Sequence, residues 1–249
     1  MFPTLNIGSF VFPTAGLVYI FGVWLCLSLV ERTAKKIGAN SEVTYGLAVT
    51  AVLVGFIGAR LTFVFQYWPA FQASPLNIIW PLTSGYNVFG GLFFGVVGGF
   101  FYGRYKQVSW ANTLDALIPG AVLGLMVVSL ADFLAGPGFG TLTSMPWGIS
   151  QYGIRRHPVQ IYELMVGGLA LLIWWFSVEK RPYAGYLFLL TTAVYSAGRL
   201  FVDAFRDNAW TTSSGLHILQ ILCFLIVVGC IFLLGYYADR TTELVPEES

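Results

Sequence analysis

Long apolar runs, separated by short polar segments, divide the chain into seven stretches. Each run holds about the 20 apolar residues that a helix needs to cross the hydrocarbon core of a bilayer. The predicted spans are residues 10–30, 43–66, 86–103, 111–135, 160–178, 183–205 and 217–237. The pattern therefore predicts an all-α integral membrane protein with seven transmembrane helices, folded as a single polytopic domain over residues 1–249.

Basic residues orient these spans. Cytoplasmic segments of membrane proteins are enriched in Lys and Arg, and every lysine of the chain lies at one set of helix ends, at positions 35, 36, 106 and 180. We therefore expect that side and the C-terminus to be cytoplasmic, and the N-terminus to be outside. The first run is not expected to be a cleavable signal peptide, because no basic segment precedes it and no small-residue cleavage site follows it.

Composition supports the same class. The chain is 57% hydrophobic and only 10% charged, against about 25% charged residues in soluble domains. This excludes a soluble enzyme and a disordered chain, and the net charge of +1 gives no basic excess for nucleic acid. Three cysteines, Cys26, Cys223 and Cys230, lie inside apolar runs and are expected to be buried hydrophobic residues rather than metal ligands or disulfides.

Five arginines remain on the predicted outer half: Arg60, Arg155, Arg156, Arg199 and Arg206. A guanidinium at mid-membrane costs about 2.5–3.5 kcal/mol on the insertion scale, and arginine is the preferred bidentate partner of phosphate and carboxylate. The set therefore predicts binding of an anionic head group. For Arg60, a side chain that reaches the interface to contact lipid is an equal alternative, and Asp132 is a candidate counter-charge for it.

The start of the fifth predicted span is unusually polar. Pro158 suits the first turn of a helix, and Gln160, Tyr162 and Glu163 follow it directly. The positive end of the helix dipole favours the charged form of a carboxyl at the position of Glu163. A simple interfacial anchor would not require His157, Gln and Glu together, so we interpret the segment as part of a site.

The sixth predicted span carries Tyr195, Arg199, Asp203 and Arg206. At 100° per residue these positions share one narrow stripe, and Arg199 and Asp203 can pair at i,i+4. The stripe predicts a polar face toward a cavity that opens outward; the alternative is a structural ion pair. His217, at the start of the last span, is interpreted as a cap or interface residue.

The third predicted span carries a glycine at every fourth position: Gly91, Gly95, Gly99 and Gly103. A face that presents only hydrogens lets a neighbouring helix approach closely. We therefore expect these glycines to pack against another helix and to have no part in chemistry.

The segment RHPVQIYE at 156–163 resembles the Arg-His-Pro-x-Gln-x-Tyr-Glu signature of the bacterial prolipoprotein diacylglyceryl transferases, and the sixth-span pattern is similar to that family's, with Asp203 where Glu is more usual. The resemblance covers essentially the whole chain. It implies an enzyme of the bacterial plasma (inner) membrane that moves diacylglyceryl from phosphatidylglycerol to the lipobox cysteine of a prolipoprotein, forming a thioether. It also implies a phosphatidylglycerol-like anionic lipid and a prolipoprotein signal peptide as partners, with no metal or organic cofactor.

The resemblance further implies two groups of site residues. The catalytic group is His157, Glu163, Tyr195 and Arg199. The group that binds the lipid substrate is Arg60, Arg156, Gln160, Tyr162, Asp203 and Arg206.

The chain also departs from the family pattern. Phe89 stands where the family has a histidine, and Leu125 and Val128 replace an arginine and an asparagine. The alternative function is therefore a catalytically degenerate relative that acts as a lipid-binding or structural subunit of a membrane complex. An active enzyme predicts that His157, Arg199 and Glu163 line one outward cavity, whereas a degenerate relative predicts that Phe89 and Leu125 fill it. A transporter is disfavoured, because no paired broken helices suggest inverted repeats.

Overall fold

The computed structural model describes residues 4–7, 10–78, 85–151 and 153–243 of the chain. Its long helices are α1 (Thr14–Lys36), α2 (Ser41–Gln66), α4 (Val88–Tyr105), α5 (Trp110–Ala135), α6 (Val159–Ser177), α7 (Tyr186–Asp203) and α8 (Ile218–Glu243). The short elements are β1 (Thr4–Ile7), β2 (Phe10–Pro13), α3 (Trp68–Gln72), β3 (Ile149–Gln151), β4 (Ile154–Arg156) and 3-10 turns at Pro75–Ile78 and Val178–Lys180.

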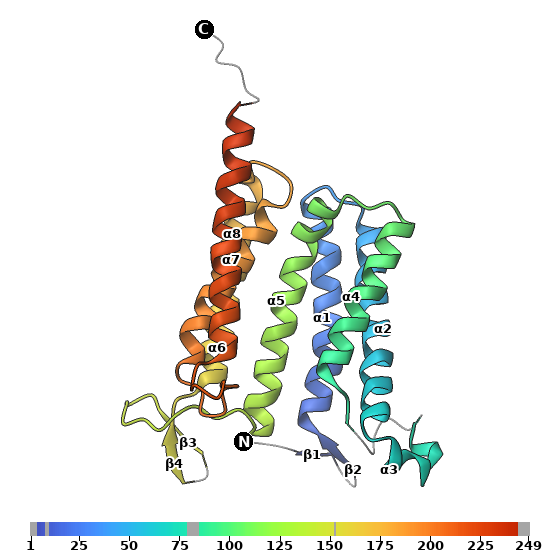
Figure 1. The fold of residues 1–249 in the computed structure, drawn as a ribbon, viewed down its shortest axis with the longest axis vertical. Coiled ribbons are helices and arrows are strands. Elements are labelled where there is room, and N and C mark those ends of the chain that lie inside the picture. Colours follow the sequence, from blue (N-terminus) through green and yellow to red (C-terminus); the bar gives the residue numbers. More distant parts are fainter. Residues whose placement is uncertain (1–3, 8–9, 79–84, 152, 244–249) are drawn as a thin grey trace.

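The long helices lie side by side and alternate in direction, which gives the bundle two different ends (Figure 1). One end, which we call the hairpin end, carries the antiparallel pairs β1–β2 and β3–β4 together with α3. The connections there are long, over 67–87, 136–158 and 204–217. The opposite, short-link end has connections over 37–40, 106–109 and 178–185. Every site residue expected from the sequence belongs to the half of the bundle near the hairpin end.

Each of the seven predicted spans coincides with one long helix, to within a few residues. By length and apolar composition, five of the described helices could cross a membrane, namely those at Thr14–Lys36, Ser41–Gln66, Trp110–Ala135, Val159–Lys180 and Ile218–Arg240. The largest boundary errors are at the first span, which begins with strand β2 and whose helix continues to Lys36 rather than 30, and at the last, whose helix continues to Glu243 rather than 237. The two small β-hairpins were not predicted.

The glycine stripe packs α4 against α2, as predicted. A Cβ atom on Gly55 of α2 would lie 2.9 Å from the carbonyl oxygen of Gly91. A Cβ on Gly95 would lie 3.0 Å from the carbonyl oxygen of Ala51. The two backbones are thus in direct contact, and only glycine allows this approach.

Replacing Gly55 by alanine is expected to destabilise the protein by about 1–3 kcal/mol, because a Cβ has to push two helix backbones apart. The matched control is Gly229→Ala on α8, where a new Cβ meets no atom within 4 Å. Thermal unfolding in detergent measures both variants. A Gly55 variant as stable as the Gly229 variant would show that the α2–α4 contact can relax without cost.

At the short-link end, the fully buried Asp115 of α5 fixes the start of α7. Its two carboxylate oxygens accept hydrogen bonds from the backbone N–H groups of Gly185 (2.8 Å) and Phe188 (2.7 Å). The first N–H groups of a helix have no partner within the helix, so Asp115 acts as an N-cap supplied by another helix. Arg181, 3.6 Å away, compensates its charge.

Asp115→Asn is expected to cost about 2–3 kcal/mol of stability, since charge-assisted hydrogen bonds to the α7 backbone are lost and one amide hydrogen then faces an N–H donor. The control is Glu179→Gln at the same end, because the Glu179 side chain is 84% exposed. Unfolding in detergent again provides the measurement. Equal stability of the two variants would contradict the capping role of Asp115.

Candidate functional site

A buried ionic cluster joins three helices near the hairpin end, with Glu163 of α6 at its centre. One carboxylate oxygen of Glu163, Oε1, lies 2.9 Å from Arg199 Nη1 of α7 and is hydrogen bonded by Arg206 Nη2. The other, Oε2, accepts a 2.6 Å hydrogen bond from the Ser129 hydroxyl of α5. Glu163 is only 6% exposed, so solvent screens these charges weakly. A single carboxylate thus holds two guanidinium groups together.

The cluster continues along α7 to the start of α8. Asp203 Oδ1 lies 3.8 Å from Arg199 Nη2, which is the predicted i,i+4 pair. Asp203 Oδ2 lies 3.0 Å from His217 Nδ1. His217 does precede α8, as expected of a cap, but its pairing with buried Asp203 was not predicted. The chain between 203 and 217 turns back on itself, and no local pattern in the sequence signals that return.

Arg206 reaches the cluster by a different route from the one predicted. Helix α7 ends at Asp203, so Arg206 lies in the following turn and not on the helical stripe. Its backbone pairs with Gly140 as an isolated β-bridge. This bridge ties the 204–217 link to the 136–158 link and directs the guanidinium back to Glu163.

Gln160, one turn before Glu163, fastens the same link to α6. Its side-chain nitrogen donates to the carbonyl oxygens of Pro137 (2.9 Å) and Gly138 (2.7 Å). Gly138 has a φ of +79°, a conformation suited to glycine. A Cβ atom on Gly138 would point toward Arg206 and Asp132, because it would lie 3.6 Å from Arg206 Nη1 and 3.9 Å from Asp132 Oδ2.

Asp132 therefore lies beside Arg206, and its predicted role as counter-charge of Arg60 is wrong. Arg60 of α2 instead donates to the backbone carbonyls of Asn77, Ile78 and Gly85. These contacts make Arg60 an anchor for the 67–87 link. A guanidinium donates readily to carbonyl oxygens as well as to anions, so the sequence could not distinguish the two roles.

The charges of the cluster decide what it can do. Three carboxylates, those of Asp132, Glu163 and Asp203, lie among two guanidiniums, so the ionised cluster carries a net negative charge, which a cationic His217 would at most neutralise. An anion that binds Arg199 and Arg206 has to replace Glu163 as their partner. Within the described part of the cluster, the buried Arg199 Nη1, Arg206 Nε and Gln160 Oε1 have no hydrogen-bond partner, which leaves two donors and one acceptor for a ligand.

A second feature, which we call the aromatic groove, lies on the other side of α6 and α7. It has a volume of about 500 Å³ and is lined by Met145, Trp147, His157, Tyr162, Met165, Val166, Phe201, Val202 and Phe205. Successive residues at the ends of these helices divide between the two features: Tyr162 lines the groove, and Glu163 enters the cluster. His157 lines the groove but Arg199 and Glu163 do not, so the groove does not unite these three residues as expected of a single cavity.

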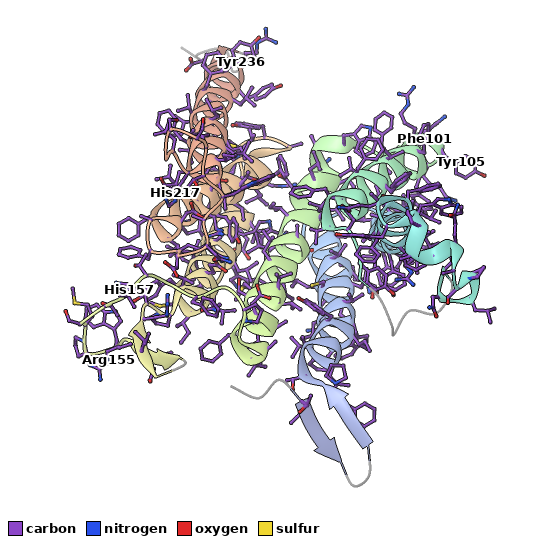
Figure 2. All side chains as sticks on the ribbon, turned by 60° about the horizontal axis from the view of Figure 1, so that its bottom comes forward. Phe101, Tyr105, Arg155, His157, His217 and Tyr236 are labelled. Atoms are coloured by element: carbon purple, nitrogen blue, oxygen red, sulfur yellow. The ribbon has the colours of Figure 1, made fainter. Side chains whose placement is uncertain are left out.

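The remaining predicted residues lie around these two features. Arg156 pairs with Asp207 at 2.8 Å and donates to the carbonyl of Gly140, which fastens β4 to the 204–217 link. Tyr195 lies one turn before Arg199 on α7 and is half-buried. Figure 2 shows His157 and Arg155 on the same side of the molecule, beside the β3–β4 hairpin.

Phe89, Leu125 and Val128, which replace expected polar residues, are exposed apolar side chains. Phe89 is 66% exposed at the start of α4 and its ring lies 5.8 Å from that of Trp210. Leu125 and Val128 are 46% and 44% exposed on α5. The expectation that Phe89 and Leu125 fill a cavity is therefore wrong.

Comparison with known proteins gives one consistent result. The family model described as prolipoprotein diacylglyceryl transferase matches residues 4–236. Three of the relatives that carry the name phosphatidylglycerol–prolipoprotein diacylglyceryl transferase illustrate the similarity. The protein from Clostridioides difficile is 26% identical over 94% of both chains. The one from Bordetella avium is 32% identical over 82% of this chain and 80% of its own, and the one from Oleidesulfovibrio alaskensis is 30% identical over 89% and 87%.

Proposed function

The chain belongs to the prolipoprotein diacylglyceryl transferase family, and on that premise we propose that it transfers diacylglyceryl from phosphatidylglycerol to the cysteine of a prolipoprotein. In this reaction the cysteine sulfur forms a bond to the terminal glycerol carbon of the diacylglyceryl group. The bond from that carbon to the phosphate oxygen breaks, and glycerol phosphate leaves with the electron pair. The thiol gives up its proton, and the product is a thioether.

The protein acts in the bacterial plasma membrane, where both substrates are found. We propose that all seven long helices cross it, with the hairpin end outside and the C-terminus in the cytoplasm. This orientation is supported by the lysines, all of which lie at the short-link end or beside it. It exposes the long connections and the ionic cluster to the outer leaflet. Association with other membrane subunits remains a prediction.

The observation that carries the proposed mechanism is the convergence of Arg199 and Arg206 on Glu163. The lipid phosphate would take the place of the Glu163 carboxylate between the two guanidiniums, and these would stabilise the charge that develops on the leaving group. Asp203, held in turn by His217, positions Arg199. Tyr195, one turn before Arg199, would contact the same lipid.

Displacement of Glu163 also supplies a proton acceptor. Once displaced, its buried carboxylate no longer has its two cationic partners. We propose that it accepts the thiol proton, directly or through Ser129, which already contacts it. Such a role would need no histidine at position 89. The predicted role of His157 as the base stays a prediction, since His157 lines the aromatic groove and its Nδ1 lies 3.1 Å from the Tyr162 hydroxyl.

Transfer of labelled diacylglyceryl from phosphatidylglycerol to a lipobox peptide tests the function directly. The purified full-length protein is assayed in detergent–lipid micelles beside an active family member. We expect a thioether product with the cysteine peptide and none with a peptide that carries serine instead. No product, with the active relative working under the same conditions, would contradict the transferase and favour the lipid-binding or structural subunit.

A further inference from the structure

The aromatic groove has the shape and position of a lipid site separate from the ionic cluster. Its volume of about 500 Å³ falls in the range of ligand pockets, about 300–1,000 Å³. Met165 of α6 and Phe201 of α7, on its two sides, are 68% and 67% exposed. They belong to the apolar outer faces of helices in a bilayer, so an occupant can enter the groove sideways from lipid.

A chain of hydrogen bonds fixes the polar groups of the groove. Trp147 Nε1 donates to the Tyr162 hydroxyl oxygen at 2.8 Å, and that hydroxyl lies 3.1 Å from His157 Nδ1. The arrangement that pairs every group has the hydroxyl donating to Nδ1, which places the imidazole hydrogen on Nε2. Within the described residues, His157 Nε2 has no other partner. The groove therefore offers one directed N–H donor in otherwise apolar surroundings.

A cation lies beside the groove. The side chain of Arg155 runs over Gly148, where a Cβ would come within 2.7 Å of Arg155 Cγ, and Gly148 directly follows Trp147 of the groove. Arg155 is exposed and forms no ion pair with any residue that the structure describes. Its neighbour Arg156, in contrast, is paired with Asp207. Arg155 is thus available to an external anion at the mouth of the groove.

We propose that the aromatic groove binds one acyl chain of an anionic phospholipid. The chain lies between α6 and α7, His157 Nε2–H donates to its ester carbonyl, and Arg155 contacts the phosphate. Charge complementarity favours this occupant, because a neutral apolar peptide segment would gain nothing from Arg155. In a phospholipid, the acyl tail matches the apolar lining, the ester carbonyl matches the N–H donor, and the phosphate matches the cation.

This lipid is not the one placed at Arg199 and Arg206 for transfer. Residues 162 and 205 line the groove, whereas their neighbours 163 and 206 take part in the cluster, so the two features share none of these residues. Binding in the groove requires no turnover. The proposal therefore goes beyond the proposed function and can be tested without it.

Trp147 provides the readout, because bromine atoms on an acyl chain quench the fluorescence of a tryptophan that they contact. The full-length protein is reconstituted in vesicles of brominated phosphatidylglycerol or brominated phosphatidylcholine. The quenching of Trp147 fluorescence is obtained as the difference between the quenching measured in the wild type and that measured in Trp147→Phe. Trp175→Phe, which removes an exposed tryptophan near Lys36 at the short-link end, is the matched control.

We expect quenching of Trp147 to favour brominated phosphatidylglycerol, and Arg155→Gln to reduce that preference by about fivefold, the effect of one cation near an anionic lipid. Lys106→Gln, an exposed cation at the short-link end, should leave it unchanged. No quenching attributable to Trp147 would overturn the proposal, and so would equal quenching by both lipids in the wild type. Either result would leave the transfer assay unaffected.

Discussion

Replacement of Arg199 by alanine is expected to lower kcat/KM for diacylglyceryl transfer by about 100- to 1,000-fold, the cost of removing one preorganised donor from a developing anion. Arg199 and Arg206 converge on a single carboxylate oxygen of Glu163, which marks the place where a phosphate would bind. Removing one guanidinium halves the positive charge at that place. The measurement is the initial rate of transfer to a lipobox peptide over a range of phosphatidylglycerol concentrations.

Two variants make this result specific. Arg199→Lys keeps the charge but loses the forked geometry, so it should recover only part of the rate. Arg104→Ala removes an exposed arginine from the last turn of α4, at the opposite end of the bundle, and should leave the rate unchanged. A normal rate in Arg199→Ala would exclude the ionic cluster as the phosphate site.

Glu163→Ala is expected to destabilise the fold by about 3–5 kcal/mol, because it leaves two buried guanidiniums without their common partner and the Ser129 hydroxyl without its acceptor. The free energy of unfolding in detergent measures this loss. The matched control is Glu31→Ala. Glu31 is also paired, with Lys35, but both side chains are exposed, so the loss should stay below about 1 kcal/mol.

A double-mutant cycle separates the pair from the rest of the cluster. If Glu163 stabilises the protein by neutralising Arg199, then Arg199→Ala should be less harmful in a Glu163→Ala background than in the wild type. Additive losses of stability would instead mean that Glu163 acts through Ser129 or through packing.

The helices could be predicted from the sequence because the bilayer imposes one simple requirement, about 20 apolar residues per span. The pairing of Arg199 with Asp203 and the close packing of the α4 glycines against another helix follow from helix periodicity alone, and both are present. The contacts of residues in the long connections could not be predicted in this way. Contacts such as Asp203 with His217, or Arg206 with Glu163, depend on how long connections fold back.

Hydrogen bonds between side chains and backbone carbonyl groups could not be predicted from the sequence either. For Arg60, anion binding and an interfacial anchor were equal alternatives, yet its donors meet carbonyl groups of the 67–87 link. The division of RHPVQIYE between two features was also unforeseen. Adjacent residues such as Tyr162 and Glu163 point to different sides of a helix, so a motif that is continuous in sequence supplies both the aromatic groove and the cluster.

The ionic cluster has a consequence for the synthesis of the protein. Helix α7, which carries Arg199 and Asp203, is not among the helices apolar enough by composition to cross a membrane alone. Its charges are compensated when Glu163 of α6 is beside it, and only the short 178–185 link separates the two helices. We therefore expect α7 to leave the insertion machinery together with α6, as a helical hairpin. The residues that build the site thus also determine how this part of the chain enters the membrane.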